Sequence, residues 1–269
     1  MCLIRTTLIA FVLCLMAPAG ARADIVLSPL RTVLTAETRE GAFTISNPTR
    51  RILDGRVSWI DLSATAAGYE PAASEVRAGL SAAPYLSVSP AQFRLKPGER
   101  VTVTVKLRDG IAPPPGEKRS HLLIETGAAR TLIRKASNGL QADIGAGVSA
   151  PVIVRGDGAA SATIGETKLL RDSEGRLLLS AAITPHGSHS AYGRLKATFT
   201  PKDPRASTSG VLGVRENVAG YLDTEKRIVE IPLDRFSLGE GELTLLYEGA
   251  GEYEGRLFDK RSFDIAPPK

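Results

Sequence analysis

Histidines, serines and two cysteines are the residues of this 269-residue chain whose side chains could carry out covalent or metal chemistry. His186 and His189 are three residues apart, and in a loop two imidazoles at this spacing could reach one metal ion. Two ligands are too few for a site, and no carboxylate lies close by in the sequence. His121 is a lone strand histidine, which is more often structural than catalytic. We therefore predict no metal site.

Motifs for catalysis or cofactor binding are equally scarce. The chain has no Gly-x-Ser-x-Gly elbow and no His-Glu-x-x-His helix motif. The glycine-rich stretch 239–242 is interpreted as a turn between strands, since no helix pattern follows it as a dinucleotide loop would require. The sequence predicts a protein with no catalytic residues and no cofactor.

The first 23 residues have the features of a secretory signal. Arg5 provides a positive start, residues 8–16 form an apolar run, and small residues flank Arg22 before a predicted cut after Ala23. A lipoprotein signal using Cys14 is the alternative, but a bulky leucine precedes that cysteine. We expect a periplasmic protein that begins at Asp24.

Removal of this signal changes the chemistry of the chain. Both cysteines leave with it, so no disulfide or free thiol is expected. The 34 basic residues fall to 32 against 29 acidic residues, which gives a net charge of +3. A charge this small and diffuse does not indicate nucleic acid. No later segment is apolar enough for an integral membrane span.

The most informative segment runs from Leu140 to Arg155. Its even-numbered positions are apolar, and Gln, Asp, Gly and Ser fill the odd positions of its first half. In a strand such alternation places the apolar side chains on one face. A long core strand is one interpretation. The other is that the first half offers an apolar ladder to a partner protein, main chain to main chain.

The elements that must position this segment are strands. Hydrophobic periodicity is mostly two after Asp24, and turn residues recur at short intervals. Thr65–Ala83 is alanine-rich and could hold a helical turn; almost no other helix is expected. We predict an all-β protein with two immunoglobulin-like β-sandwich domains in tandem. Their ranges are 24–156 and 157–269, with a flexible joint at 156–160.

Three stretches resemble the periplasmic chaperones of pilus assembly, the chaperone–usher family built from two immunoglobulin-like domains. They are residues 28–48, which include Ser-Pro-Leu-Arg and Ile-Ser-Asn-Pro, residues 86–99, which end in Phe-Arg-Leu-Lys-Pro-Gly-Glu, and residues 149–155. They occur in the family's order and cover the first domain. Ser190-Ala191-Tyr192-Gly193 resembles a stretch of its divergent members.

The resemblance implies a function in binding. Family members lend a strand to pilin subunits, which lack their last strand, until an outer-membrane usher accepts the subunit. The implied partners are pilin-like subunits and the usher. The implied lent face consists of Leu140, Ala142, Ile144, Ala146 and Val148. These side chains would cover a groove that otherwise exposes apolar surface.

The resemblance also implies how a subunit's C-terminal carboxylate is held. Two basic residues in the interdomain cleft anchor it in the best-known members. Arg31 stands at the first position, with a solvated edge residue as the alternative interpretation. Pro151 stands where the second, a lysine, is expected. Arg155 is the candidate substitute, and a plain strand-end charge is its alternative.

Two other functions remain open from sequence. One is a secreted structural or adhesive β-sandwich that is itself part of a surface fibre. The other is a secreted β-rich hydrolase, which the absence of a site motif disfavours.

Overall fold

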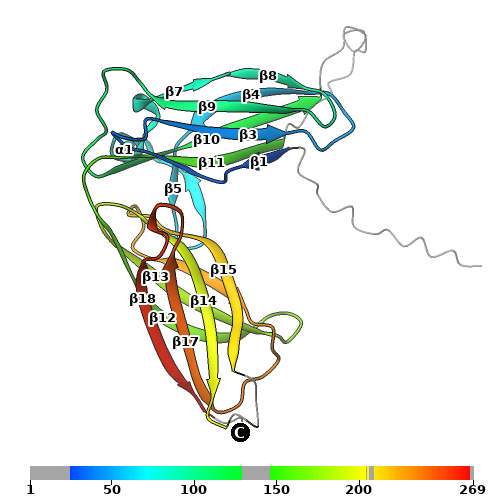
Figure 1. Cartoon of the computed structure of the whole chain (residues 1–269), viewed down its shortest axis with the longest axis vertical. Coiled ribbons are helices and arrows are strands. Elements are labelled where there is room, and N and C mark those ends of the chain that lie inside the picture. Colours follow the sequence, from blue (N-terminus) through cyan, green and yellow to red (C-terminus); the bar gives the residue numbers. More distant parts are fainter. Residues whose placement is uncertain (1–24, 129–145, 204, 206–208, 267–269) are drawn as a thin grey trace, which may run out of the picture.

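The computed structural model describes residues 25–128, 146–203, 205 and 209–266. Two β-sandwiches follow one another along the chain and meet at an angle, so that the molecule has the outline of a bent rod (Figure 1). Each sandwich has its own core of buried apolar side chains. The predicted all-β class is confirmed.

The first sandwich has the strand order of an immunoglobulin domain. One sheet contains, in order, β1 (Val26–Ser28), β3 (Glu40–Ser46), β9 (Arg100–Leu107) and β7 (Leu86–Ser89). The other contains β2 (Thr32–Leu34), β11 (Ala146–Arg155), β10 (Glu117–Ala128), β4 (Leu53–Ile60) and β8 (Gln92–Leu95). These correspond to the two sheets A-B-E-D and G-F-C of that fold.

Alternating residues build this core as the sequence predicts. In β9, Val103 and Val105 point into the sandwich and are fully buried, while Thr104 between them faces outward. They pack with Phe43 from the neighbouring strand β3. The turn before β9 closes through the Glu99 amide, which donates to the Lys96 carbonyl at 3.0 Å. Gly98 lies in the left-handed region there, with φ of 76°.

The first strand changes sheets, and this places Arg31. The segment from Ile25 to Leu34 is divided between two strands. β1 pairs with β3 in one sheet, and β2 pairs in parallel with β11 in the other. Residues 29–31 cross between the sheets, and Arg31 contacts Glu252 of the second sandwich.

The second sandwich also has an immunoglobulin-like arrangement. One sheet contains, in order, β12 (Ala160–Arg171), β13 (Leu177–Gly187) and β16 (Arg227–Pro232). The other contains β15 (Gly210–Gly220), β14 (Ala191–Pro201), β17 (Gly241–Gly249) and β18 (Leu257–Ile265). Phe199, Leu243 and Tyr247 fill the space between these sheets. A short 3-10 turn, η3 (Gly251–Tyr253), connects the last two strands at the end that faces the first sandwich.

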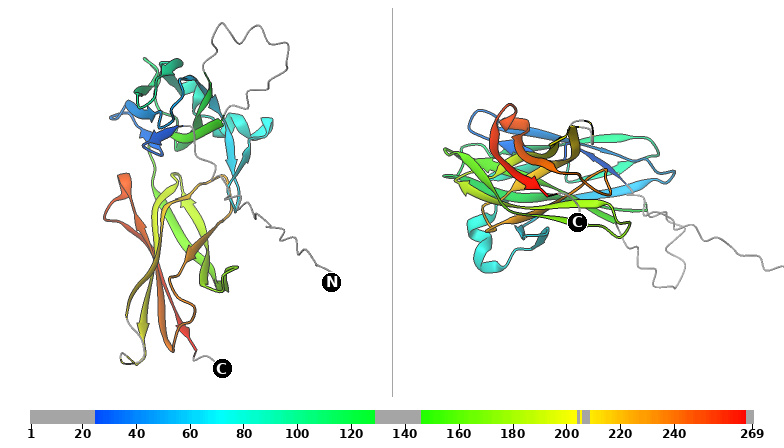
Figure 2. Two further views of the ribbon diagram at one scale, coloured as in Figure 1. Left: turned by 90° about the vertical axis from the view of Figure 1, so that its right-hand side faces the viewer. Right: turned by 90° about the horizontal axis from the view of Figure 1, so that it is seen from below.

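The segment after β4 differs from its expected form. It contains the predicted short helix, α1 (Ser74–Leu80), and a 3-10 turn, η1 (Ala83–Tyr85). Before them, β5 (Leu62–Ala64) and β6 (Tyr69–Pro71) form a hairpin that the sequence did not reveal. This hairpin extends toward the second sandwich (Figure 2). There the Ile228 amide donates to the Ala66 carbonyl at 2.7 Å.

Within the part of the chain that the structure describes, no helix combines the length and the apolar character needed to cross a bilayer.

Candidate functional site

The candidate site lies where the two sandwiches meet. Strand β11 reaches this junction with its final residues, and its alternation assigns their side chains to two faces. Val152 and Val154 enter the first core. Ile153, on the other face, joins a small apolar cluster with Tyr221 of the second sandwich. Arg155 follows with the same orientation as Ile153, and so it too faces the junction.

Arg155 is buried and holds three groups of the protein itself. Its side chain is 5% exposed. Its Nε donates to Glu117 at 2.7 Å, and one terminal nitrogen donates to Glu252 at 2.6 Å. The other terminal nitrogen donates to the carbonyl of Ser190 at 3.0 Å. The interpretation of Arg155 as a plain strand-end charge is therefore wrong: it joins β11 and β10 to two segments of the second sandwich.

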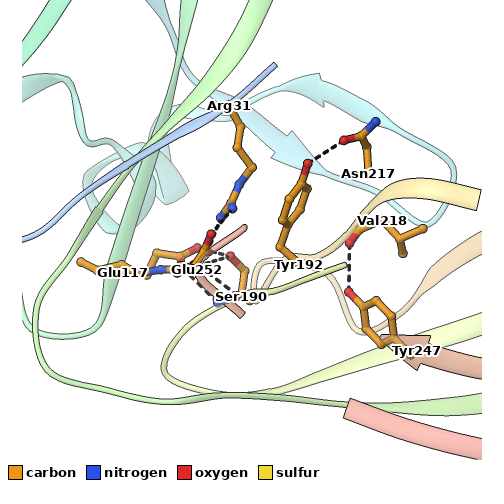
Figure 3. Close-up of polar contacts among 9 residues, drawn as sticks. Arg31, Glu117, Ser190, Tyr192, Asn217, Val218, Tyr247 and Glu252 are labelled. Atoms are coloured by element: carbon orange, nitrogen blue, oxygen red, sulfur yellow. Dashed lines mark hydrogen bonds and ion pairs between the residues drawn. The ribbon is translucent and has the colours of Figure 1, made fainter. Parts of the chain in front are cut away.

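Glu117 is fully engaged by this network. The Ser190 amide donates to one carboxylate oxygen at 3.0 Å, and the Ser190 hydroxyl donates to the other at 2.6 Å. Burial disfavours the charge of Arg155, but Glu117 and Glu252 more than compensate, and its pKa lies above its ordinary value. Figure 3 shows Glu117, Ser190 and Glu252 gathered between the two domains.

Arg31 faces the same cluster from the opposite side. Its two terminal nitrogens donate to the two carboxylate oxygens of Glu252, at 2.7 and 2.9 Å. Its guanidinium also lies over the ring of Tyr192, with Cζ 4.1 Å from the ring centroid. The Arg31 side chain is only 8% exposed. The solvated-edge interpretation is thus wrong, although the carboxylate that Arg31 holds belongs to this chain.

Glu252 bridges the two arginines. It lies in η3, with its side chain 30% exposed. Burial would raise the pKa of its carboxyl group, but the hydrogen bonds and charges of Arg31 and Arg155 dominate and hold that pKa below its ordinary value. The carboxylate is therefore ionised near neutral pH.

A pocket of about 540 Å³ opens beside Arg31. Residues 29–33 form one wall, and Ala250, Gly251 and Glu252 form the opposite wall. Tyr192 and Asn217 complete the lining, and the Tyr192 hydroxyl donates to the Asn217 side chain at 2.6 Å. Figure 3 shows the Tyr192 ring between Arg31 and the second sandwich.

The position expected to carry a second cation is neutral. Pro151 is half-buried on β11 and lies opposite His121 of β10. His121 is buried, and neither ring nitrogen has a hydrogen-bond partner. Desolvation, assisted by the positive charge of Arg119, lowers its pKa to about 4. Neither Pro151 nor His121 therefore provides a cation here near neutral pH.

A second ion pair ties the domains together across the apolar cluster. Two nitrogens of Arg119 donate to the carboxylate of Asp223, at 3.1 and 2.9 Å. Asp223 also accepts from the Ala64 amide of the β5–β6 hairpin at 2.7 Å. The Arg119 guanidinium lies 3.9 Å from the ring centroid of Tyr221. The junction thus has an arginine-centred contact on each side of Ile153 and Tyr221.

The predicted lent strand is only partly described. Leu140, Ala142 and Ile144 lie outside the described residues, and β11 begins at Ala146. Val148 is half-buried and packs against the first core. The β10 ladder continues to the pair Thr126 and Ala146.

The opposite edge of β11 is open over the same stretch. β2 pairs with β11 only at Val152, Ile153 and Val154. Among the described residues no strand covers this edge from Ala146 to Pro151. Proline is tolerated at such an edge because its missing N–H need not meet a neighbouring strand.

His186 and His189 form hydrogen bonds with different groups and do not form a common site. His186 shares a hydrogen bond with the Thr163 hydroxyl at 3.1 Å, and His189 contacts the Gly156 carbonyl at 3.1 Å. In the described ranges no three His, Cys, Asp or Glu side chains come together as a metal site would require.

Arg31 and Arg155 were candidates from the sequence, but their partners in this network were not. Ser190 lies in a stretch noted only for its resemblance to a family. Glu117 and Glu252 carried no signal, because a glutamate in a turn or at the start of a strand is ordinarily solvated.

Comparison with known proteins gives matches among solved structures alone: no family model matches the chain, and neither does any curated protein. The YadV chaperone is 8% identical over 90% of this chain and 100% of its own, with a TM-score of 0.45. The class 5 fimbriae chaperone CfaA is 10% identical over 91% and 100%, with a TM-score of 0.42. A chain from the Salmonella enterica complex of the SafA pilin with the SafB chaperone is 14% identical over 92% and 99%, with a TM-score of 0.39.

Proposed function

We propose that this protein is a periplasmic chaperone of the chaperone–usher type. It binds a pilin-like subunit by lending a strand, protects the subunit's apolar groove, and delivers it to an outer-membrane usher. Export by the N-terminal signal, with cleavage after Ala23, brings it to the compartment where such subunits fold.

The open edge of β11 is the observation that carries this proposal. An uncovered strand edge offers main-chain donors and acceptors to an incoming strand. Here that edge lies at the end of a ladder held by β10, and it overlaps the last part of the apolar alternation of residues 140–148. The alternating face supplies side chains for a partner's groove, and the main chain supplies hydrogen bonds.

Arg31 is the better of the two candidate carboxylate anchors. Arg155 is buried and its three nitrogens are committed to Glu117, Glu252 and Ser190. Arg31 borders the pocket, and its guanidinium presents a planar fork that fits a carboxylate. With Pro151 neutral, a subunit is held by one charged contact and the strand ladder.

Periplasmic co-expression with small secreted proteins of pilin-like pattern tests the proposal. A true subunit is soluble only in the presence of this protein and co-purifies with it. Polymerisation of the protein by itself, with no subunit captured, would instead indicate a fibre component.

A charge on the lent face tests the mechanism. Ile144→Asp should abolish capture, because an unpaired carboxylate would enter an apolar groove at a cost of roughly 3–5 kcal/mol. Gln141→Asp adds the same charge on the opposite parity of the strand and should leave capture intact. Equal subunit yields from both variants would refute the lending mechanism; circular dichroism confirms that each is folded.

A further inference from the structure

Arg31, the candidate receptor for a subunit's carboxylate at the junction, is already occupied by a carboxylate of the protein itself. Both terminal nitrogens of Arg31 are bound to Glu252, and its Nε is buried without a hydrogen-bond partner. Tyr192 supports one face of the guanidinium. Arg31 is therefore held in a fixed orientation beside the open pocket, with its charge neutralised by an internal carboxylate.

The charge balance of the cluster leaves no room for a further carboxylate. Two arginines, Arg31 and Arg155, face two glutamates, Glu117 and Glu252, so the formal charges cancel. A ligand carboxylate added to this arrangement would lie close to Glu252, and both arginines of the cluster are already paired with glutamates. A second anion that shares a partly buried site is strongly disfavoured. Binding at Arg31 therefore requires Glu252 to withdraw.

The contacts of Glu252 allow such a withdrawal at low cost. Oε2 accepts from Arg31, whereas Oε1 accepts from both Arg31 and Arg155, the latter at 2.6 Å. A rotation away from Arg31 can leave Oε1 on Arg155. Glu252 also lies in the three-residue turn η3 behind Gly251, whose φ is 62°, and it is the more exposed member of its pair with Arg31.

Resting on the proposed chaperone function, we propose that Glu252 is a built-in competitor for the C-terminal carboxylate of the bound subunit. In the free protein Glu252 closes the fork of Arg31. On binding, the terminal carboxylate enters the pocket and replaces Glu252 on Arg31, while Glu252 keeps its contact with Arg155. One bidentate ion pair is exchanged for another.

This exchange makes the site selective for the C-terminal carboxylate of a paired subunit over a small free carboxylate. A small free carboxylate gains nothing that Glu252 does not already provide, so it binds poorly. A carboxylate at the end of a chain that is already paired with β11 arrives at high effective concentration, and so it can displace Glu252. Binding of the carboxylate to Arg31 therefore requires the subunit strand to be paired with β11 in the correct register.

Removal of the competitor should expose the receptor to a simple probe. The probe is N-acetylglycine, with N-acetylglycinamide as the uncharged control, titrated into the mature protein and followed by NMR of the arginine side chains. Glu252→Gln should bind N-acetylglycine at least tenfold more tightly than the wild type. Glu254→Gln, a neighbouring exposed glutamate, should behave as the wild type. Arg31→Met combined with Glu252→Gln should lose the binding.

A second variant guards against loss of folding. Glu252→Asp retains a negative charge for Arg155, but its shorter side chain cannot also span Arg31, so it too should bind the probe more tightly than the wild type. Equal affinity of the wild type and both Glu252 variants would overturn the inference, as would binding of the amide control. The probe has no strand to add, so this outcome is independent of whether the protein captures a subunit.

Discussion

Arg155→Met removes the charge at the centre of the interdomain network and nearly preserves the volume. It leaves the carboxylate of Glu117, 6% exposed, without its cation, and it removes one of the two arginines that hold Glu252. Loss of one partner from a buried ion pair costs about 3–5 kcal/mol, because the remaining charge stays desolvated. Ser190 still donates two hydrogen bonds to Glu117, so we expect the lower end of that range.

Urea unfolding of the mature protein, followed by tryptophan fluorescence and circular dichroism, measures this loss. Arg94→Met is the matched control: Arg94 holds Asp54 at 2.6 and 2.9 Å, but the pair is exposed, with side chains 63% and 42% accessible. No measurable loss is expected there. Adding Glu117→Gln to Arg155→Met should restore part of the stability. If Arg155→Met unfolds at the same urea concentration as Arg94→Met, the network does not stabilise the junction.

Two further predictions concern protonation and packing. His121 has a pKa of about 4 in the folded protein, against 6.5 for an ordinary histidine. As the pH is lowered from 6.5 to 4, the imidazole therefore takes up a proton in the unfolded chain before it does so in the folded protein. The free energy of unfolding should fall over this range by up to about 3 kcal/mol. Urea unfolding over this range should show the fall, and His121→Phe should remove it; an unchanged pH slope in that variant would contradict the assignment. A methyl group on Gly55 would lie 2.1 Å from the Phe93 ring, whereas one on Gly79 of α1 meets nothing within 4 Å. Thermal melting should therefore show Gly55→Ala less stable by roughly 1–3 kcal/mol and Gly79→Ala unchanged or slightly more stable.

The first sandwich could be predicted from sequence because its signals are local. Strand β9 alternates valine with threonine between two turns, and the Lys96–Glu99 turn contains a glycine that adopts a positive φ. Each of these features depends on residues adjacent in the chain. The same is true of β14 and β17 in the second sandwich, where buried and less buried residues alternate along the strand.

Elements whose pattern is broken or weak were missed. β12 begins with alanines on its buried face and shifts register between Ile164 and Thr167, so its period of two is interrupted. β15 has two shifts in its pairing with β14. The apolar residues of the β5–β6 hairpin are mostly alanines, and the hairpin is held partly by contacts with Asp223 and Ile228 of the other domain. Such strands depend on their partners, which a single-sequence pattern does not contain.

The partners of the two arginines were invisible for a related reason. Glu252 is 221 residues from Arg31 in the sequence, and only the arrangement of the two sandwiches brings them together. Sequence resemblance could therefore suggest that Arg31 faces a carboxylate, but it could not show that the chain itself supplies one.

The neutral Pro151 and the hairpin over the junction fit together physically. A lysine at this position would lie opposite the buried His121, whose own charge is already suppressed by burial and by Arg119. Tyr69 of the hairpin packs edge-on against His121 with ring centroids 5.0 Å apart, and His121 is 2% exposed. An ammonium brought against this buried ring would need a carboxylate, and the nearby Asp223 is already paired with Arg119. Covering the sheet with the hairpin thus favours a neutral residue at 151, and the cation that can meet a ligand carboxylate is then Arg31, at the edge of the covered region beside the open pocket.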